Sequence, residues 1–223
     1  MDQTARLPLF PLPMTACPLE IVPLHIFEER YKAMIHACQQ AQAVGGLGEF
    51  VLVYQAGANR AEVGTSLRLS SVLQAYANGS MDILATGTRR CRILREFQDQ
   101  SYGEAEVQWV CDGHSDWTES LATEAFQLHQ TLLQMSTGHT PPDSFYSGKF
   151  LLSFALMASL GLPTEEKQAL LELDNEDERL GQVIGHMKKA IRILETARGF
   201  QEAVQSWWNL NRVVRKWKTS SPP

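Results

Sequence analysis

The pattern of apolar residues changes once along this chain of 223 residues, and that change limits the folds the chain can adopt. Up to about residue 111, short runs of alternating apolar and polar residues are separated by turn-forming residues, as is typical of β-strands. From about residue 116, apolar residues recur at three- and four-residue spacing, as is typical of amphipathic helices. The sequence therefore predicts an α+β protein with strands and helices in separate parts of the chain.

The first part contains several short strand candidates joined by tight turns. Segment 102–110 (YGEAEVQWV) alternates apolar and polar residues, which predicts a strand with one buried face. Asn78 and Gly79 form a strong hairpin-turn pair because both tolerate positive φ, and we expect a second turn at Gly87. Many short strands with tight turns predict a small barrel or curled sheet.

An apolar strand runs directly into a helix at residues 22–35 (VPLHIFEERYKAMI). The spacing predicts a helix over roughly 28–42, and we expect four of its apolar side chains to be mainly core: Phe27, Tyr31, Met34 and Ile35. His25 alternates with Leu24 and Ile26 and so points to the opposite face. We interpret it as a packing or surface histidine; the alternative is a general base beside Glu28.

The second part is predicted to be helical. Segment 149–160 (KFLLSFALMASL) is apolar nearly all round, which predicts a central, buried helix. Acidic residues after Pro163 predict the start of another helix, and a last long helix or helix pair is expected from 177 to about 217. These patterns divide the chain into a strand-rich part at 1–112, a helical bundle at 116–217 and a flexible tail at 218–223.

Composition excludes several classes of protein. The formal net charge of −5 and a pI near 5.7 argue against binding nucleic acid through bulk charge, so we expect no DNA partner. The longest apolar run is far shorter than the roughly 20 residues of a membrane span, and the N-terminal residues lack the features of a signal peptide. Four cysteines without a CxxC pair are typical of reduced thiols, so we expect a cytoplasmic protein without membrane contact.

No motif of catalytic or cofactor chemistry occurs in the sequence. The phosphate-binding G-x-x-x-x-G-K-[ST] loop, the H-E-x-x-H zinc motif and the G-x-S-x-G nucleophile turn are all missing. The six histidines are scattered and form no pair at metal-ligand spacing. We therefore expect no catalytic residues, no cofactor and no metal, and we predict that the chain is not an enzyme.

Two basic segments are candidates for binding a partner. Arg89, Arg90, Arg92 and Arg95 form a cluster on a predicted strand; a solvated strand face is the plainer interpretation, and contact with phosphates the alternative. Near the C-terminus, Trp208 stands beside basic residues such as Arg212 and Arg215. Because Trp and Arg are common anchors of interfaces, these three residues are our candidate partner-binding patch.

Taken together, these segments resemble the N-terminal substrate-binding domain of Lon proteases, in order and along most of the chain. The matching segments are 7–12 (LPLFPL), 22–35 (VPLHIFEERYKAMI), 63–65 (VGT), 82–93 (DILATGTRRCRI), 102–107 (YGEAEV) and the short runs LP, KQ, LLE and RL within 162–180. The resemblance implies a PUA-like β-barrel followed by an α-helical bundle. It does not extend to the ATPase and peptidase parts of Lon, which implies a stand-alone Lon-domain protein of the bacterial kind.

The resemblance also implies a function. We expect a non-enzymatic module that recognises unfolded or specific protein segments, for proteolysis or quality control, in an apolar groove between barrel and bundle. The alternative, since PUA-like barrels often bind RNA, is an RNA-binding module that uses the cluster from Arg89 to Arg95.

Overall fold

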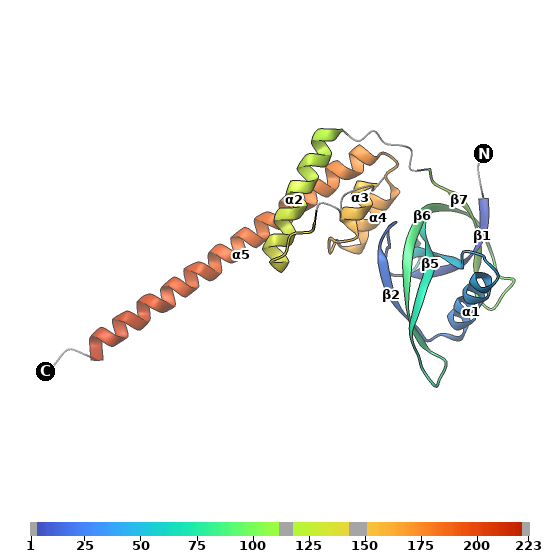
Figure 1. Ribbon diagram of the computed structural model, residues 1–223, viewed down its shortest axis with the longest axis horizontal. Helices are drawn as coiled ribbons and strands as arrows, with labels where there is room; N and C mark the ends of the chain where they lie inside the picture. The colour runs from blue at the N-terminus through green and yellow to red at the C-terminus, as the bar shows by residue number, and fades with distance from the viewer. Residues whose placement is uncertain (1–3, 112–117, 143–150, 220–223) are drawn as a thin grey trace.

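A computed structural model describes residues 4–111, 118–142 and 151–219, and within the last range it describes only the backbone of 203–219. Figure 1 shows a curled sheet with one helix against it, joined to a group of helices from which the C-terminal helix extends. The α+β class and the order of strands before helices are as the sequence predicts.

Seven strands make up the sheet. They are β1 (Thr4–Leu12), β2 (Ile21–Ile26), β3 (Glu49–Ala56), β4 (Asn59–Arg60), β5 (Val63–Ala75), β6 (Met81–Phe97) and β7 (Glu104–Trp109). Pairing runs β1-β7-β6-β5-β3, and a parallel pairing of β1 with β3 closes these five strands into a ring. β2 lies off this ring and pairs with β6. The expected barrel is thus a curled sheet whose pairing closes on itself.

Helix α1 (Glu29–Ala43) packs against one face of the sheet, close to the expected 28–42. Tyr31, Met34 and Ile35 are buried in one core cluster with side chains of β2, β3, β5 and β6, as predicted. Phe27 is not: 62% of its surface is exposed. Residues 21–26 alternate between exposed and buried, and Phe27 continues this alternation outward because it precedes the first turn of the helix.

The two expected turns have different outcomes. Asn78 and Gly79 do form the hairpin turn between β5 and β6, with Gly79 at a φ of 77°. Gly87 is not a turn but lies within β6, so that prediction is wrong. A Cβ at this position would lie 2.1 Å from the backbone oxygen of Cys17. Glycine is required at residue 87 because the 17–20 segment passes directly against the strand.

Four helices follow the sheet in the part of the chain that the structure describes: α2 (Glu119–Thr137), α3 (Leu152–Met157), α4 (Thr164–Glu172) and α5 (Glu176–Thr219). α3 is shorter than the expected 149–160, but every one of its residues is buried. The last helix is a single continuous one, and Figure 1 shows its C-terminal portion extending past α2. The helices share a core of aliphatic side chains that also includes Cys17 and Val63 from the strand half.

Polar contacts join the strand half to α4. The Lys167 ammonium lies 2.5 Å from the Glu20 carboxylate, and the Gln168 amide donates to the backbone oxygen of Val63 over 3.0 Å. Arg90 is fully buried and donates to the backbone oxygens of Leu171 and Leu173 over 2.7 and 2.9 Å. These contacts hold the two parts against each other, and we propose the division near residues 112–116 as one of subdomains.

Candidate functional site

The outward face of β2 carries exposed apolar side chains at the margin of the sheet. Ile21 is 64% exposed and Pro23 is also exposed, while Val22 and Leu24 between them are buried. Phe27 continues this exposed row. Directly opposed residues of paired strands share a face, so Leu84 of β6, which pairs with Pro23 and is partly buried, extends the row onto the next strand.

A polar and aromatic cluster lies at one end of this row. His25 Nδ1 and the Tyr76 hydroxyl each lie 2.6 Å from one oxygen of the Asp82 carboxylate. The His25 ring stacks on Phe27, with centroids 5.9 Å apart, and meets Tyr76 edge to face at 6.1 Å. We call the surface formed by Ile21, Pro23, His25, Phe27, Tyr76 and Leu84 the sheet-margin patch.

Hydrogen bonding shapes the electrostatics of the patch. The bond from Tyr76, followed by that from His25, lowers the pKa of Asp82 below its ordinary value. The same bond raises the pKa of the Tyr76 hydroxyl. Asp82 therefore holds a negative charge that orients two aromatic side chains and leaves their apolar faces to solvent. His25 is a surface histidine, as interpreted from the sequence, with Asp82 as its carboxylate partner.

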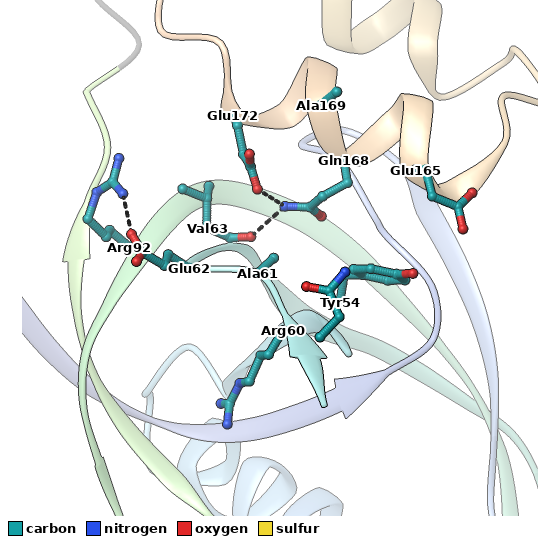
Figure 2. A pocket seen from close by; sticks show the side chains of 11 residues that line it. Tyr54, Arg60, Ala61, Glu62, Val63, Arg92, Glu165, Gln168, Ala169 and Glu172 are labelled. Atoms are coloured by element: carbon teal, nitrogen blue, oxygen red, sulfur yellow. Dashed lines mark hydrogen bonds and ion pairs between the residues drawn. The ribbon is translucent and has the colours of Figure 1, made fainter. Parts of the chain in front are cut away.

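A cleft of about 590 Å³ lies between the sheet and α4 (Figure 2). It lies where an apolar groove between strands and helices was expected, but its lining is mainly polar and charged. Arg92 pairs with Glu62 at 3.2 Å, and Gln168 donates to Glu172 over 2.8 Å. The first pair lies on the strand side of the cleft and the second on α4, while Gln168 also donates across the cleft to the Val63 backbone oxygen (Figure 2). The cleft therefore offers an apolar segment few apolar contacts.

A smaller hollow of about 250 Å³ lies within the helical part, between α2, α5 and the segment before α4. Its lining is mainly aliphatic: Leu132, Leu133, Leu160, Leu162, Met187 and Ala190, with Ser136, Ser159, Gly161 and His186 at its border. The hollow is apolar but has less room than the roughly 300–1,000 Å³ of typical ligand pockets.

The arginine cluster does not form one basic face. Arg90 is buried against α4, and its guanidinium lies over the Phe154 ring. Arg89 is exposed and lies over the Trp109 ring, at 3.6 Å from its centroid. Arg90 and Arg89 thus face different surroundings, and the interpretation as a solvated strand face is wrong for Arg90. The positions of the arginines along β6 could not reveal that α4 covers one of them.

The candidate patch of Trp208, Arg212 and Arg215 lies outside the residues whose side chains are described. The backbone places all three within α5. Their role in binding a partner stays a prediction: Trp208→Ala should weaken association and leave the thermal midpoint nearly unchanged.

Among the described residues there is neither a cluster of metal ligands nor a helix that could span a membrane. Within residues 4–111, 118–142 and 151–219, no three His, Cys, Asp or Glu side chains come together in a metal-binding group. In the same part of the chain, none of the helices is both long enough and apolar enough to cross a bilayer.

The fold is that of the N-terminal domain of Lon proteases. The crystal structure of a Lon N-terminal domain protein from Xanthomonas campestris matches with a TM-score of 0.62 and 24% identity, over 81% of this chain and 98% of that one. The N-terminal domain of the Mycobacterium avium complex Lon protease matches with a TM-score of 0.63 and 19% identity, over 82% and 98%.

Sequence comparison identifies the family. Residues 6–189 match the model of the ATP-dependent protease La (LON) substrate-binding domain, and the chain belongs to that family. Lon protease 2 of Herpetosiphon aurantiacus is 27% identical over 217 residues, which cover 91% of this chain and 26% of that protein. The Lon protease of Cytophaga hutchinsonii is 27% identical over 157 residues, 65% of this chain and 19% of that protein. The chain thus spans 26% and 19% of the length of these two relatives.

Proposed function

We propose that this chain binds exposed apolar segments of unfolded or partly folded protein, and that the sheet-margin patch is the contact surface. The observation that carries the proposal is the exposure of Phe27 and Ile21, at 62% and 64%, on one row beside the buried core. Large apolar side chains that remain exposed together mark an interaction surface. The family supports the proposal because its members are substrate-binding domains.

The chemistry of the patch fits a partner without fixed sequence. Phe27, His25 and Tyr76 offer ring faces and edges to apolar side chains. Asp82 holds the His25 and Tyr76 rings by hydrogen bonds, and Phe27 stacks on His25. Aromatic side chains present a large contact area and lose little conformational entropy on binding. A surface of this kind binds many apolar segments weakly, as a module that samples unfolded proteins requires.

Binding without catalysis is part of the proposal. The purified chain, incubated with an unfolded protein with and without ATP, should leave that protein intact. Reproducible cleavage that persists through further purification would contradict this part.

The binding surface can be tested with a permanently unfolded, fluorescently labelled protein, such as reduced and carboxymethylated lactalbumin. The double variant Ile21→Ser, Phe27→Ser should lose most of the binding measured by fluorescence anisotropy, because both contacts are removed. Ile193→Ser is a matched control, since Ile193 is as exposed as Phe27, at 60%, but lies on α5. Equal affinities for the wild type and the double variant would overturn the proposal.

A further inference from the structure

The hydrogen-bond register of β2 shows which of its backbone groups face away from the sheet. Gly87 N–H donates to the backbone oxygen of Glu20 over 2.8 Å. The β2–β6 register, in which Ile21 pairs with Thr86, makes these two residues directly opposed. A direct bond between opposed residues defines a hydrogen-bonded pair, and such pairs alternate with non-bonded ones in an antiparallel ladder.

Alternation then assigns every residue of the strand. Val22, Leu24 and Ile26 direct their N–H and C=O groups to β6, on the same side as the backbone oxygen of Glu20. Ile21, Pro23 and His25 direct theirs to the opposite edge. Pro23 supports this assignment independently, because proline has no N–H and is accepted in a strand where that group would face outward.

That outer edge is open in the described part of the chain. β2 pairs with β6 and with no other described strand. Apart from the β2–β6 ladder, no backbone hydrogen bond reaches Ile21, Pro23 or His25 from another described residue. In Figure 1, β2 forms the margin of the sheet. The edge therefore presents outward donors at residues 21 and 25 and acceptors at 21, 23 and 25.

We propose that the outer edge of β2 binds an extended polypeptide segment as an added β-strand. This inference rests on the proposed function and names the conformation in which a substrate is held. The occupant is an extended chain because donors and acceptors at every second residue are complementary to a strand backbone and to no helix, whose backbone groups bond internally. The exposed Ile21 and His25 side chains and the neighbouring Phe27 contact the apolar side chains of the added strand.

Pro23 sets the strength of this interaction. It lies at the centre of the edge and has no N–H group there. A strand added at this edge therefore forms a ladder that lacks its middle hydrogen bond from β2. Prolines on edge strands also limit pairing between copies of a protein. An interrupted edge binds a segment weakly enough to release it, as a module that passes substrates on must do.

Two substitutions test the backbone contact. Pro23→Val restores the middle donor and should bind a short labelled peptide of alternating leucine and serine about 2- to 10-fold more tightly, the effect of one hydrogen bond. His25→Pro and His25→Ala lack the same side-chain contacts, but the proline also lacks the outward N–H. The proline variant should therefore bind about 2- to 10-fold more weakly than the alanine variant.

The readout separates backbone from side-chain binding. Two N-methylated peptides are compared, one methylated at the odd-numbered amides and the other at the even-numbered amides. Only one of these two sets faces β2, so one peptide should lose binding and the other should keep it. Unchanged affinity in Pro23→Val, together with equal effects of both N-methylated peptides, would overturn the proposal, and these measurements do not depend on the folding of the His25 variants.

Two further outcomes are informative. In the first, the double variant Ile21→Ser, Phe27→Ser loses binding, but Pro23→Val binds as the wild type does and both N-methylated peptides bind as the unmethylated peptide does. Strand addition is then refuted and the proposed function stands. If Pro23→Val forms dimers in sedimentation and binds no peptide, the edge pairs with a second copy, and the proposal is also refuted.

Discussion

The imidazole of His25 lies 2.6 Å from the carboxylate of Asp82, across the β2–β6 pair. The two residues are directly opposed in the register, and the Asp82 carboxylate also accepts from the Tyr76 hydroxyl. One carboxylate thus links the edge strand to the β5–β6 hairpin. This relationship holds the aromatic rings of the sheet-margin patch in place.

Acid should weaken this link. The folded-state pKa of Asp82 is lowered, first by the bond from Tyr76, so the ionised carboxylate stabilises the fold above its unfolded-state pKa. That contribution is lost as the pH falls through the lowered folded-state pKa. Tyr76→Phe should therefore reduce the urea midpoint at neutral pH, and the difference from wild type should shrink in acid. A difference that is independent of pH would contradict the assignment.

Phe27 should matter little for stability. Its side chain is mostly exposed, so Phe27→Ala should change the free energy of unfolding by about 0.5 kcal/mol or less, as surface substitutions usually do. Phe50 is fully buried in the same half of the protein, and Phe50→Ala should cost about 3–5 kcal/mol. Urea denaturation of both variants measures the contrast, and a similar loss in the two would place Phe27 in the core.

Arg90 should be required for the contact between the sheet and α4. Arg90→Leu leaves the Leu171 oxygen without its charged donor, while the Leu173 oxygen keeps its bond from Arg179. We expect a loss of about 2–4 kcal/mol, since such bonds are not additive. Arg92→Leu is the matched control on the same strand. Its partner Glu62 is exposed, so we expect a change of at most about 1 kcal/mol. Equal effects in thermal or chemical denaturation would argue against the buried role.

Gly87 should tolerate no side chain. Gly87→Ala places a Cβ against the Cys17 backbone oxygen, which forces the 17–20 segment away from β6 and should cost about 1–3 kcal/mol or more. Gly161→Ala is the control, because a Cβ there meets no atom within 4 Å. Chemical denaturation compares the two variants. A Gly87→Ala protein as stable as wild type would contradict the close approach.

Local pattern in the sequence determined the elements and their order. Alternation predicted the strand at 102–110 and the outward direction of His25, because successive side chains of a strand point to opposite faces wherever the strand lies. Helical spacing predicted α1 with Tyr31, Met34 and Ile35 in the core, and the Asn78-Gly79 pair predicted the hairpin. The segments shared with Lon N-terminal domains predicted the family, since they recur in order along most of the chain.

Contacts between distant segments decided the rest. Phe27 is as apolar as a core residue and stands between a strand and a helix, and only the structure shows that it follows the alternation of the strand and lies outside. In the sequence, Arg90 is one of four similar arginines. Only the structure shows that it binds carbonyl oxygens at the end of α4, about eighty residues later in the chain. Gly87 resembles a turn residue until the Cys17 backbone fills the space beside it. The periodicity of a sequence indicates the face to which a side chain points. Whether that side chain is buried depends on which element packs against the face, and only the tertiary structure determines this packing.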